Sequence, residues 1–174
     1  LETVYGGASV GEALTSAGCD KYLFTGSVKT GRAILESLAK SGTPCAMELS
    51  GNDAFIVCAD APLEVAARSL VWGRVCNAGQ SCVAPQRCYV HHACYEAFIG
   101  LVQTEIERLG VQETTPLRTY EARERCHEMV LEAVAEGARC LVGGVLKREE
   151  QGFFYAPTLL IDCTESMRAV REDL

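Results

Sequence analysis

The stretch KYLFTGSVKTGRAILESLAK, residues 21–40, indicates the fold class of this 174-residue chain. Its first five residues form a short apolar run, which predicts a β-strand at 21–25. After a Gly-Ser turn, apolar residues recur at helical spacing and predict a helix at 29–40. A second strand is expected at 45–49. A strand, a helix and a second strand in succession are typical of a parallel βαβ unit.

The same alternation continues along the rest of the chain. Further strands are expected at residues 54–59, 87–91, 140–142 and near 155–160. Further helices are expected at 10–17, from Pro62 onward, at 95–109 and at 120–136. The complete pattern predicts an α/β fold with a mostly parallel sheet and flanking helices.

Composition excludes several classes of protein. Hydrophobic residues make up 48% and charged residues 22% of the chain, an ordinary globular balance. The net charge of −7 argues against a nucleic-acid partner, which usually needs a basic face. No apolar run approaches the roughly 20 residues of a membrane helix, and no secretory signal is visible. We therefore expect a cytoplasmic protein with neither nucleic-acid nor membrane partners. Its start at Leu1 instead of a methionine indicates a processed chain or a piece of a longer one.

Ten cysteines raise the question of disulfides or a metal site. Several lie inside apolar runs, where free cysteine behaves as a small hydrophobe, so reduced thiols are expected. Cys76, Cys82, Cys88 and Cys94 recur every six residues, which invites a zinc interpretation. Zinc sites use tighter ligand pairs, with two to four residues between the ligands. We therefore predict no metal site.

Four segments carry a resemblance to a known family. They are FTGS at residues 24–27, ELSG at 48–51, NAGQSC at 77–82 and APTL at 156–159. Their order and separations resemble those of the NAD(P)-dependent aldehyde dehydrogenase superfamily, and together they span nearly the whole chain. The resemblance implies an aldehyde-dehydrogenase-like α/β fold. It also implies two domains: residues 1–47 as the C-terminal remnant of a dinucleotide-binding domain, and 48–174 as a truncated catalytic domain.

The resemblance implies an oxidoreductase that oxidises an aldehyde to a carboxylic acid. Cys82 stands where the family has its nucleophile, which forms a thiohemiacetal and then a thioester. Its backbone N–H is expected to donate to the oxyanion. Glu48 stands at the position of the general base that activates water to release the acid. NAD or NADP is the implied cofactor, a small aldehyde the substrate, and a homo-oligomer the expected assembly.

The resemblance also assigns cofactor contacts. Gly26, Ser27 and Gly31 match the family's turn beside the pyrophosphate, where backbone amides at a helix start can bind phosphate. Leu49 and Ser50 match the lining of the nicotinamide pocket, although Ser50 replaces the usual glycine. A sixth residue, Asp173, falls at the position of a ribose-binding glutamate and is one carbon shorter. Gln80 is near the nicotinamide ribose in the family.

One alternative stays open from the sequence alone. Without the upstream residues that bind the adenosine ribose and the family's upstream asparagine, the isolated chain is expected to be inactive. It could then be an isolated domain lacking cofactor affinity, or a non-catalytic binding or scaffold module. The sequence also leaves open which aldehyde is used, NAD against NADP, and water against coenzyme A as acyl acceptor.

Overall fold

The computed structural model describes residues 2–109, 115–146 and 152–172. Contacts divide the chain into two compact units, unit 1 from Leu1 to Ser50 and unit 2 from Gly51 to Leu174. The expected α/β class is confirmed, because strands and helices alternate along both units. Each unit is described below by itself.

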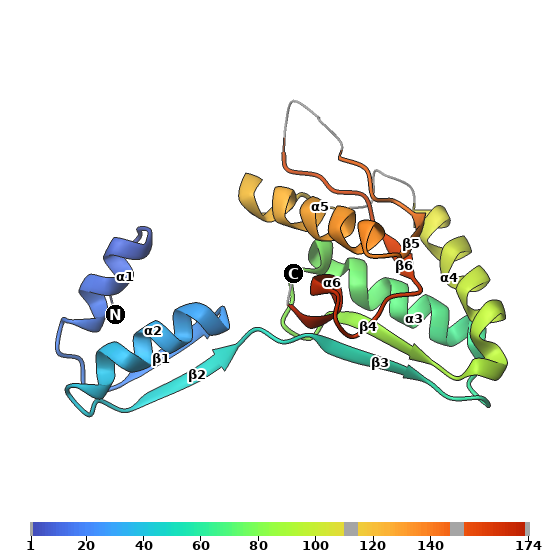
Figure 1. The fold of residues 1–174 in the computed structure, drawn as a ribbon. Coiled ribbons are helices and arrows are strands. Elements are labelled where there is room, and N and C mark those ends of the chain that lie inside the picture. Colours follow the sequence, from blue (N-terminus) through green and yellow to red (C-terminus); the bar gives the residue numbers. More distant parts are fainter. Residues whose placement is uncertain (1, 110–114, 147–151, 173–174) are drawn as a thin grey trace. The chain divides into compact units, whose positions relative to one another are not determined.

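Unit 1 is a single βαβ unit preceded by a short helix. Helix α1 (Ala8–Thr15) leads to strand β1 (Tyr22–Gly26), helix α2 (Val28–Ala39) and strand β2 (Cys45–Leu49). The two strands pair in parallel, from Tyr22 opposite Cys45 to Gly26 opposite Leu49. Helix α2 runs along this pair (Figure 1). The sequence prediction of a parallel βαβ unit is therefore confirmed.

Alternation of side chains decides which face of the β1–β2 pair is covered. Along β2, Met47 and Leu49 are partly buried, whereas Glu48 between them is exposed. Successive strand residues point to opposite faces of a sheet, so Glu48 lies on the face opposite Leu49. Leu38 of α2 is 3% exposed. Gly31 of the same helix is also buried, and its contact is taken up with the site below.

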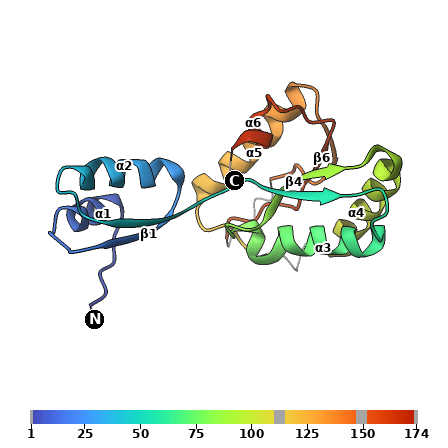
Figure 2. The same cartoon turned by 90° about the horizontal axis from the view of Figure 1, so that it is seen from below.

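Unit 2 begins with a second parallel βαβ unit. Strand β3 (Asp53–Val57), helix α3 (Leu63–Val75) and strand β4 (Pro85–Val90) follow in order. Helix α4 (Tyr95–Leu109) packs beside α3, as Figure 2 shows. Short 3-10 helices, η1 (Cys76–Gly79) and η2 (His92–Cys94), precede β4 and α4.

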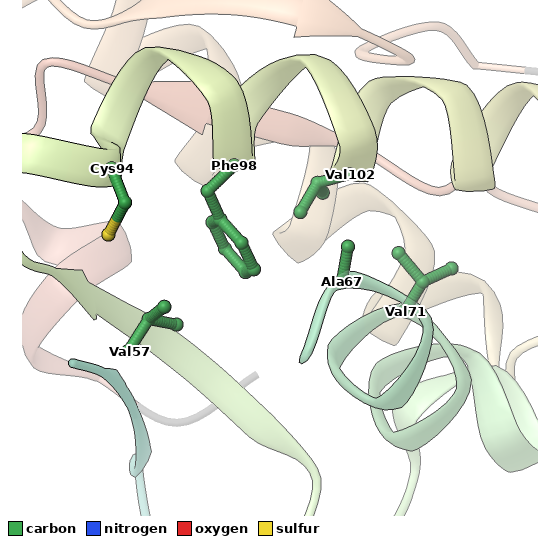
Figure 3. Close-up of a cluster of buried hydrophobic side chains, with 6 residues drawn as sticks. All are labelled: Val57, Ala67, Val71, Cys94, Phe98 and Val102. Carbon is green, nitrogen blue, oxygen red and sulfur yellow. The ribbon is translucent and has the colours of Figure 1, made fainter. Parts of the chain in front are cut away.

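The main core of unit 2 lies where α3 and α4 meet strand β3. Phe98 of α4 is 2% exposed and points toward α3 and β3 (Figure 3). The buried members of this cluster are Val57, Ala67, Val71, Cys94, Phe98 and Val102. Full burial of one such side chain contributes about 1.5–3 kcal/mol. This core packs α3, the helix that precedes the loop leading to β4, against α4 and β3.

The rest of unit 2 is a helix and an antiparallel strand pair. Helix α5 (Tyr120–Ala135) leads into β5 (Arg139–Val142), which pairs antiparallel with β6 (Leu159–Ile161). Helix α6 (Arg168–Arg171) follows. A second buried cluster of Ala133, Ala138 and Met167 joins α5 to the segment before α6.

The structure corrects three details of the sequence prediction. The described strands form three two-stranded sheets instead of one, and the third is antiparallel. The strand expected near 155–160 begins only at Leu159, because Pro157 has no N–H for a strand ladder. There the Thr158 hydroxyl donates to Ala156 O at 2.8 Å. Helix α6 was not expected at all.

Candidate functional site

The loop between α3 and β4 has an unusual backbone. Asn77 and Ala78 have φ of 53° and 55°, and Gly79 has φ of 74°. Residues other than glycine avoid this left-handed region, at a cost of roughly 1–2 kcal/mol each. Such conformations cluster at functional sites, where surrounding contacts hold them in place. The strained turn lies immediately before the predicted nucleophile.

Cys82 is exposed on a turn between two buried small residues. Gly79 is buried ahead of it and Ala84, 2% exposed, lies after it. A hydrogen bond of 3.1 Å from Ala84 N to Ser81 O closes the turn that contains Cys82. The Cys82 carbonyl oxygen lies 3.9 Å from the position that a Cβ atom on Gly51 would occupy. The thiol is therefore accessible while its backbone is anchored on both sides.

Other cysteines of unit 2 lie in different surroundings. Cys88 is exposed by residue area, but its thiol lies among neighbouring side chains, and this partial burial raises the pKa of Cys88 to about 11. Burial also raises the pKa of Cys126, and the nearby Arg74 guanidinium partly offsets that rise. Cys94 is buried in the main core. Because the thiolate is the reactive form, these three thiols are suited to packing.

The six-residue cysteine series does not form a metal site. Cys94 is buried in the core, whereas Cys76, Cys82 and Cys88 are exposed. Within residues 2–109, 115–146 and 152–172, no group of three or more His, Cys, Asp or Glu side chains could hold a metal ion. All ten cysteines, which lie in these ranges, are free thiols.

Gln80 and Arg74 brace the loop through contacts that the sequence analysis did not predict. The Gln80 amide bonds to the backbone of Asn77, Pro116 and Arg118. The Arg74 guanidinium lies against Gly79, where an added Cβ would come within 3.0 Å of its central carbon. Burial lowers the pKa of Arg74, and its Nη1 has no hydrogen-bond partner. No sequence motif indicates that the Arg74 side chain folds back against Gly79, five residues later in the chain.

A cavity of about 460 Å³ lies elsewhere in unit 2. Its lining is mostly apolar and comes from α3, β4, α4, α5 and the segment around β6. Arg74 and Ala78 reach it, but Cys82 does not line it. This apolar cavity is therefore not the candidate reaction site.

In unit 1 the structure brings five predicted cofactor residues to one edge of the β1–β2 pair. Gly26 ends β1, Ser27 caps α2, Leu49 ends β2 and Ser50 follows it. Ser50 N donates to Gly26 O at 3.0 Å, which joins the two strand ends. A side chain on Gly31 would begin 2.6 Å from Leu49 Cδ2, so glycine allows α2 to approach β2. The carboxyl edge of parallel strands is where open α/β sheets bind ligands.

This edge carries two features suited to a dinucleotide. Ser27 Oγ accepts a hydrogen bond from Thr30 N at 3.2 Å, which starts the 12-residue helix α2 beside the edge. Helix N-termini attract phosphate groups. The buried hydroxyl oxygen of Ser50 has no hydrogen-bond partner in the described structure, whereas most buried polar groups bond to protein or ordered water.

Glu48 is exposed on β2, opposite Thr25 in the register. Glu48 therefore belongs to unit 1 and Cys82 to unit 2, and each is defined within its own unit. Asp173 lies outside the described residues. No helix in the described ranges is long and apolar enough to cross a membrane.

Comparison with known proteins places these features in a family. The aldehyde dehydrogenase family model matches residues 1–174. An aldehyde dehydrogenase of Paenarthrobacter nicotinovorans is 38% identical over 156 residues, covering 86% of this chain and 34% of that protein. The chain belongs to the aldehyde dehydrogenase family.

Solved structures agree with this assignment. The putative aldehyde dehydrogenase PutA from Anabaena variabilis superposes with a TM-score of 0.90 at 32% identity, covering 94% of this chain and 36% of that one. A Mycobacterium tuberculosis aldehyde dehydrogenase complexed with NAD+ superposes with a TM-score of 0.89 at 32% identity, covering 96% and 36%. The chain spans about a third of the length of the curated relatives that it matches.

Proposed function

We propose that this chain supplies the nucleophile and the general base of an NAD(P)-dependent aldehyde dehydrogenase. The observation that carries the proposal is the exposed thiol of Cys82, held on a strained loop between buried residues. The family match over residues 1–174 supports a dehydrogenase function for that thiol.

Cys82 begins the reaction by covalent addition. Its thiolate sulfur bonds to the aldehyde carbon, and the carbonyl oxygen becomes an oxyanion toward which the Cys82 backbone N–H can donate. Bound NAD(P)+ supplies the two-electron acceptor that takes the hydride from this carbon. The acyl group then remains on the sulfur as a thioester.

Glu48 completes the reaction as the general base. Its carboxylate takes a proton from water, the water oxygen bonds to the acyl carbon, and the carbon–sulfur bond breaks to release the acid. Exposure of Glu48 supports access for that water.

The carboxyl edge of the β1–β2 pair is the proposed place for the cofactor. The start of α2 at Ser27 would bind phosphate oxygens, and Gly31 would keep that approach open. Leu49 would pack against the nicotinamide ring, and the unpartnered Ser50 hydroxyl would bond to a polar group near it. Asp173 is proposed to contact a ribose. NAD and NADP both fit this assignment.

The proposal extends to the setting of the enzyme. A small-molecule aldehyde is the proposed substrate, and a homo-oligomer in the cytoplasm is the proposed form of the protein. Nucleic-acid and membrane partners are not proposed.

Substitution of Cys82 tests the proposal in the complete protein that contains this chain. We expect Cys82→Ser to lower aldehyde oxidation by roughly a thousandfold or more, because the covalent step is lost. Cys76→Ser is the matched control, since Cys76 is an exposed thiol on the same loop. Formation of reduced nicotinamide would be followed by absorbance, with several aldehydes and both cofactors. Retained oxidation by the Cys82 variant would falsify the assignment.

A further inference from the structure

The side chain of Gln80 uses both ends of its amide within unit 2. Nε2 donates to Asn77 O at 3.1 Å and to Pro116 O at 3.3 Å. Oε1 accepts from Arg118 N at 2.7 Å. Gln80 is exposed by residue area, so water could satisfy the same groups. The amide nevertheless joins the loop to Pro116 and Arg118, which lie 36 and 38 residues after Gln80 in the chain.

Gln80 and Asn77 also close the strained turn on itself. Gln80 N donates to Asn77 O at 3.1 Å, and Asn77 Nδ2 donates to Gln80 O at 3.2 Å. Asn77 and Ala78 hold left-handed backbone angles that such residues disfavour. Without these bonds the turn would relax toward ordinary angles and displace the residues after it. Cys82 is the second residue after Gln80.

We propose that Gln80 is the positioning residue that fixes the Cys82 thiol for attack, by tying the strained turn to residues 116–118. This inference rests on the proposed function of Cys82. It differs from the cofactor contact that the resemblance suggested for Gln80, because both ends of the amide are already used within the protein.

Two variants of the complete protein separate the contributions of the amide. Gln80→Glu keeps an acceptor for Arg118 N but replaces the donor by an oxygen that faces the carbonyls of Asn77 and Pro116. Gln80→Met removes all three bonds and keeps a similar length. Gln103→Met is the matched control, since Gln103 lies on α4 and its Nε2 donates to Glu107 Oε1 of the same helix at 3.3 Å.

The measurements are the single-turnover rate of hydride release and the rate of Cys82 alkylation by iodoacetamide against pH. Both rates are divided by the concentration of folded protein with a titratable Cys82 thiol, so that a simple loss of folded protein does not change them. We expect both Gln80 variants to lose at least about tenfold in single-turnover rate. Their cofactor KM should stay unchanged, and the alkylation profile should shift. Gln103→Met should match the parent protein.

Three outcomes overturn the inference. A normal single-turnover rate in both Gln80 variants shows that the bonds do not position the thiol. A raised cofactor KM with an unchanged rate assigns Gln80 to the cofactor instead. Loss of stability with a normal rate per folded thiol assigns it to folding alone. If Gln80→Met does not fold, Gln80→Glu still provides the test. Activity retained in Cys82→Ser would show that the proposed function of Cys82 is wrong, which is a different failure from that of the Gln80 inference.

Discussion

The two βαβ units of the chain share a topology and differ in their connections. In unit 1 a single residue, Ser27, separates β1 from α2, and the candidate cofactor residues gather at the carboxyl edge of the strands. In unit 2 the helix-to-strand connection, residues 76–84 between α3 and β4, is longer than its counterpart in unit 1, residues 40–44, and it carries the strained turn and Cys82. A short connection presents backbone amides at a helix start, whereas a long one can expose a reactive side chain.

The order of the strands gives this difference a meaning. Cys82 precedes β4 and therefore lies at the amino end of that strand, next to the start of β3 at Asp53. Leu49 ends β2, and β3 begins four residues later. Under the proposed function, unit 1 contributes the cofactor residues and the base Glu48, and unit 2 contributes the nucleophile Cys82.

After the loss expected for Cys82→Ser, the largest effect should come from Glu48→Gln, which removes the base but keeps the size of the side chain. General-base catalysis contributes roughly 10²–10⁴-fold, so steady-state turnover of the complete protein should fall by about that factor. The first burst of hydride release should survive, because it precedes thioester hydrolysis. Stopped-flow absorbance measures both. Loss of the burst together with turnover would instead assign Glu48 a role before hydride transfer.

The next effect concerns the core that anchors the Cys82 loop. Phe98→Ala should lower the free energy of unfolding by about 3–5 kcal/mol, because Phe98 is 2% exposed and its removal leaves a cavity. Trp72→Ala is the control, since Trp72 is a larger aromatic residue that is 70% exposed. It should change stability by about 0.5 kcal/mol or less. Denaturant titration gives both values, and equal losses would show that the core is not where the structure places it.

The sequence predicted the elements better than their pairing. The strand at Cys45–Leu49 has the expected bounds, and α4 spans the residues whose apolar spacing marked it, because periodicity is a local property. The separation into three strand pairs and the late start of β6 depend on distant contacts, which one sequence does not reveal. The motif analysis selected Gly31 and Leu49 separately, and the structure supplied the contact between them. The braces from Gln80 and Arg74 needed coordinates, since no local pattern encodes them.

Gly31→Ala tests the close approach in unit 1. An added Cβ would begin 2.6 Å from Leu49 Cδ2, so Leu49 must shift. Overpacking of this kind costs about 1–3 kcal/mol, and the cofactor KM should rise while alkylation of Cys82 stays unchanged. Gly11→Ala is the control, because Gly11 lies in α1 with open space around its Cα. It should raise stability by up to about 1 kcal/mol. An unchanged cofactor KM in Gly31→Ala would argue against a cofactor at this edge.

The smallest effect is the sharpest comparison, because each unit has an α-helix whose capping side chain can be removed. Ser27 Oγ accepts from Thr30 N at 3.2 Å at the start of α2, and Thr119 Oγ1 accepts from Ala122 N at 3.1 Å at the start of α5. Replacement of either capping residue by alanine should cost about 1 kcal/mol of stability.

The proposed function places a cofactor phosphate beside the cap at Ser27 and none beside the cap at Thr119. Ser27→Ala should also raise the cofactor KM, because the start of α2 would no longer be fixed for phosphate. Thr119→Ala should leave the cofactor KM unchanged. Thermal unfolding and cofactor titration of the two variants provide the measurement. If both variants lose stability and neither changes the cofactor KM, the start of α2 is an ordinary helix cap, and the phosphate assignment at Ser27 must be abandoned.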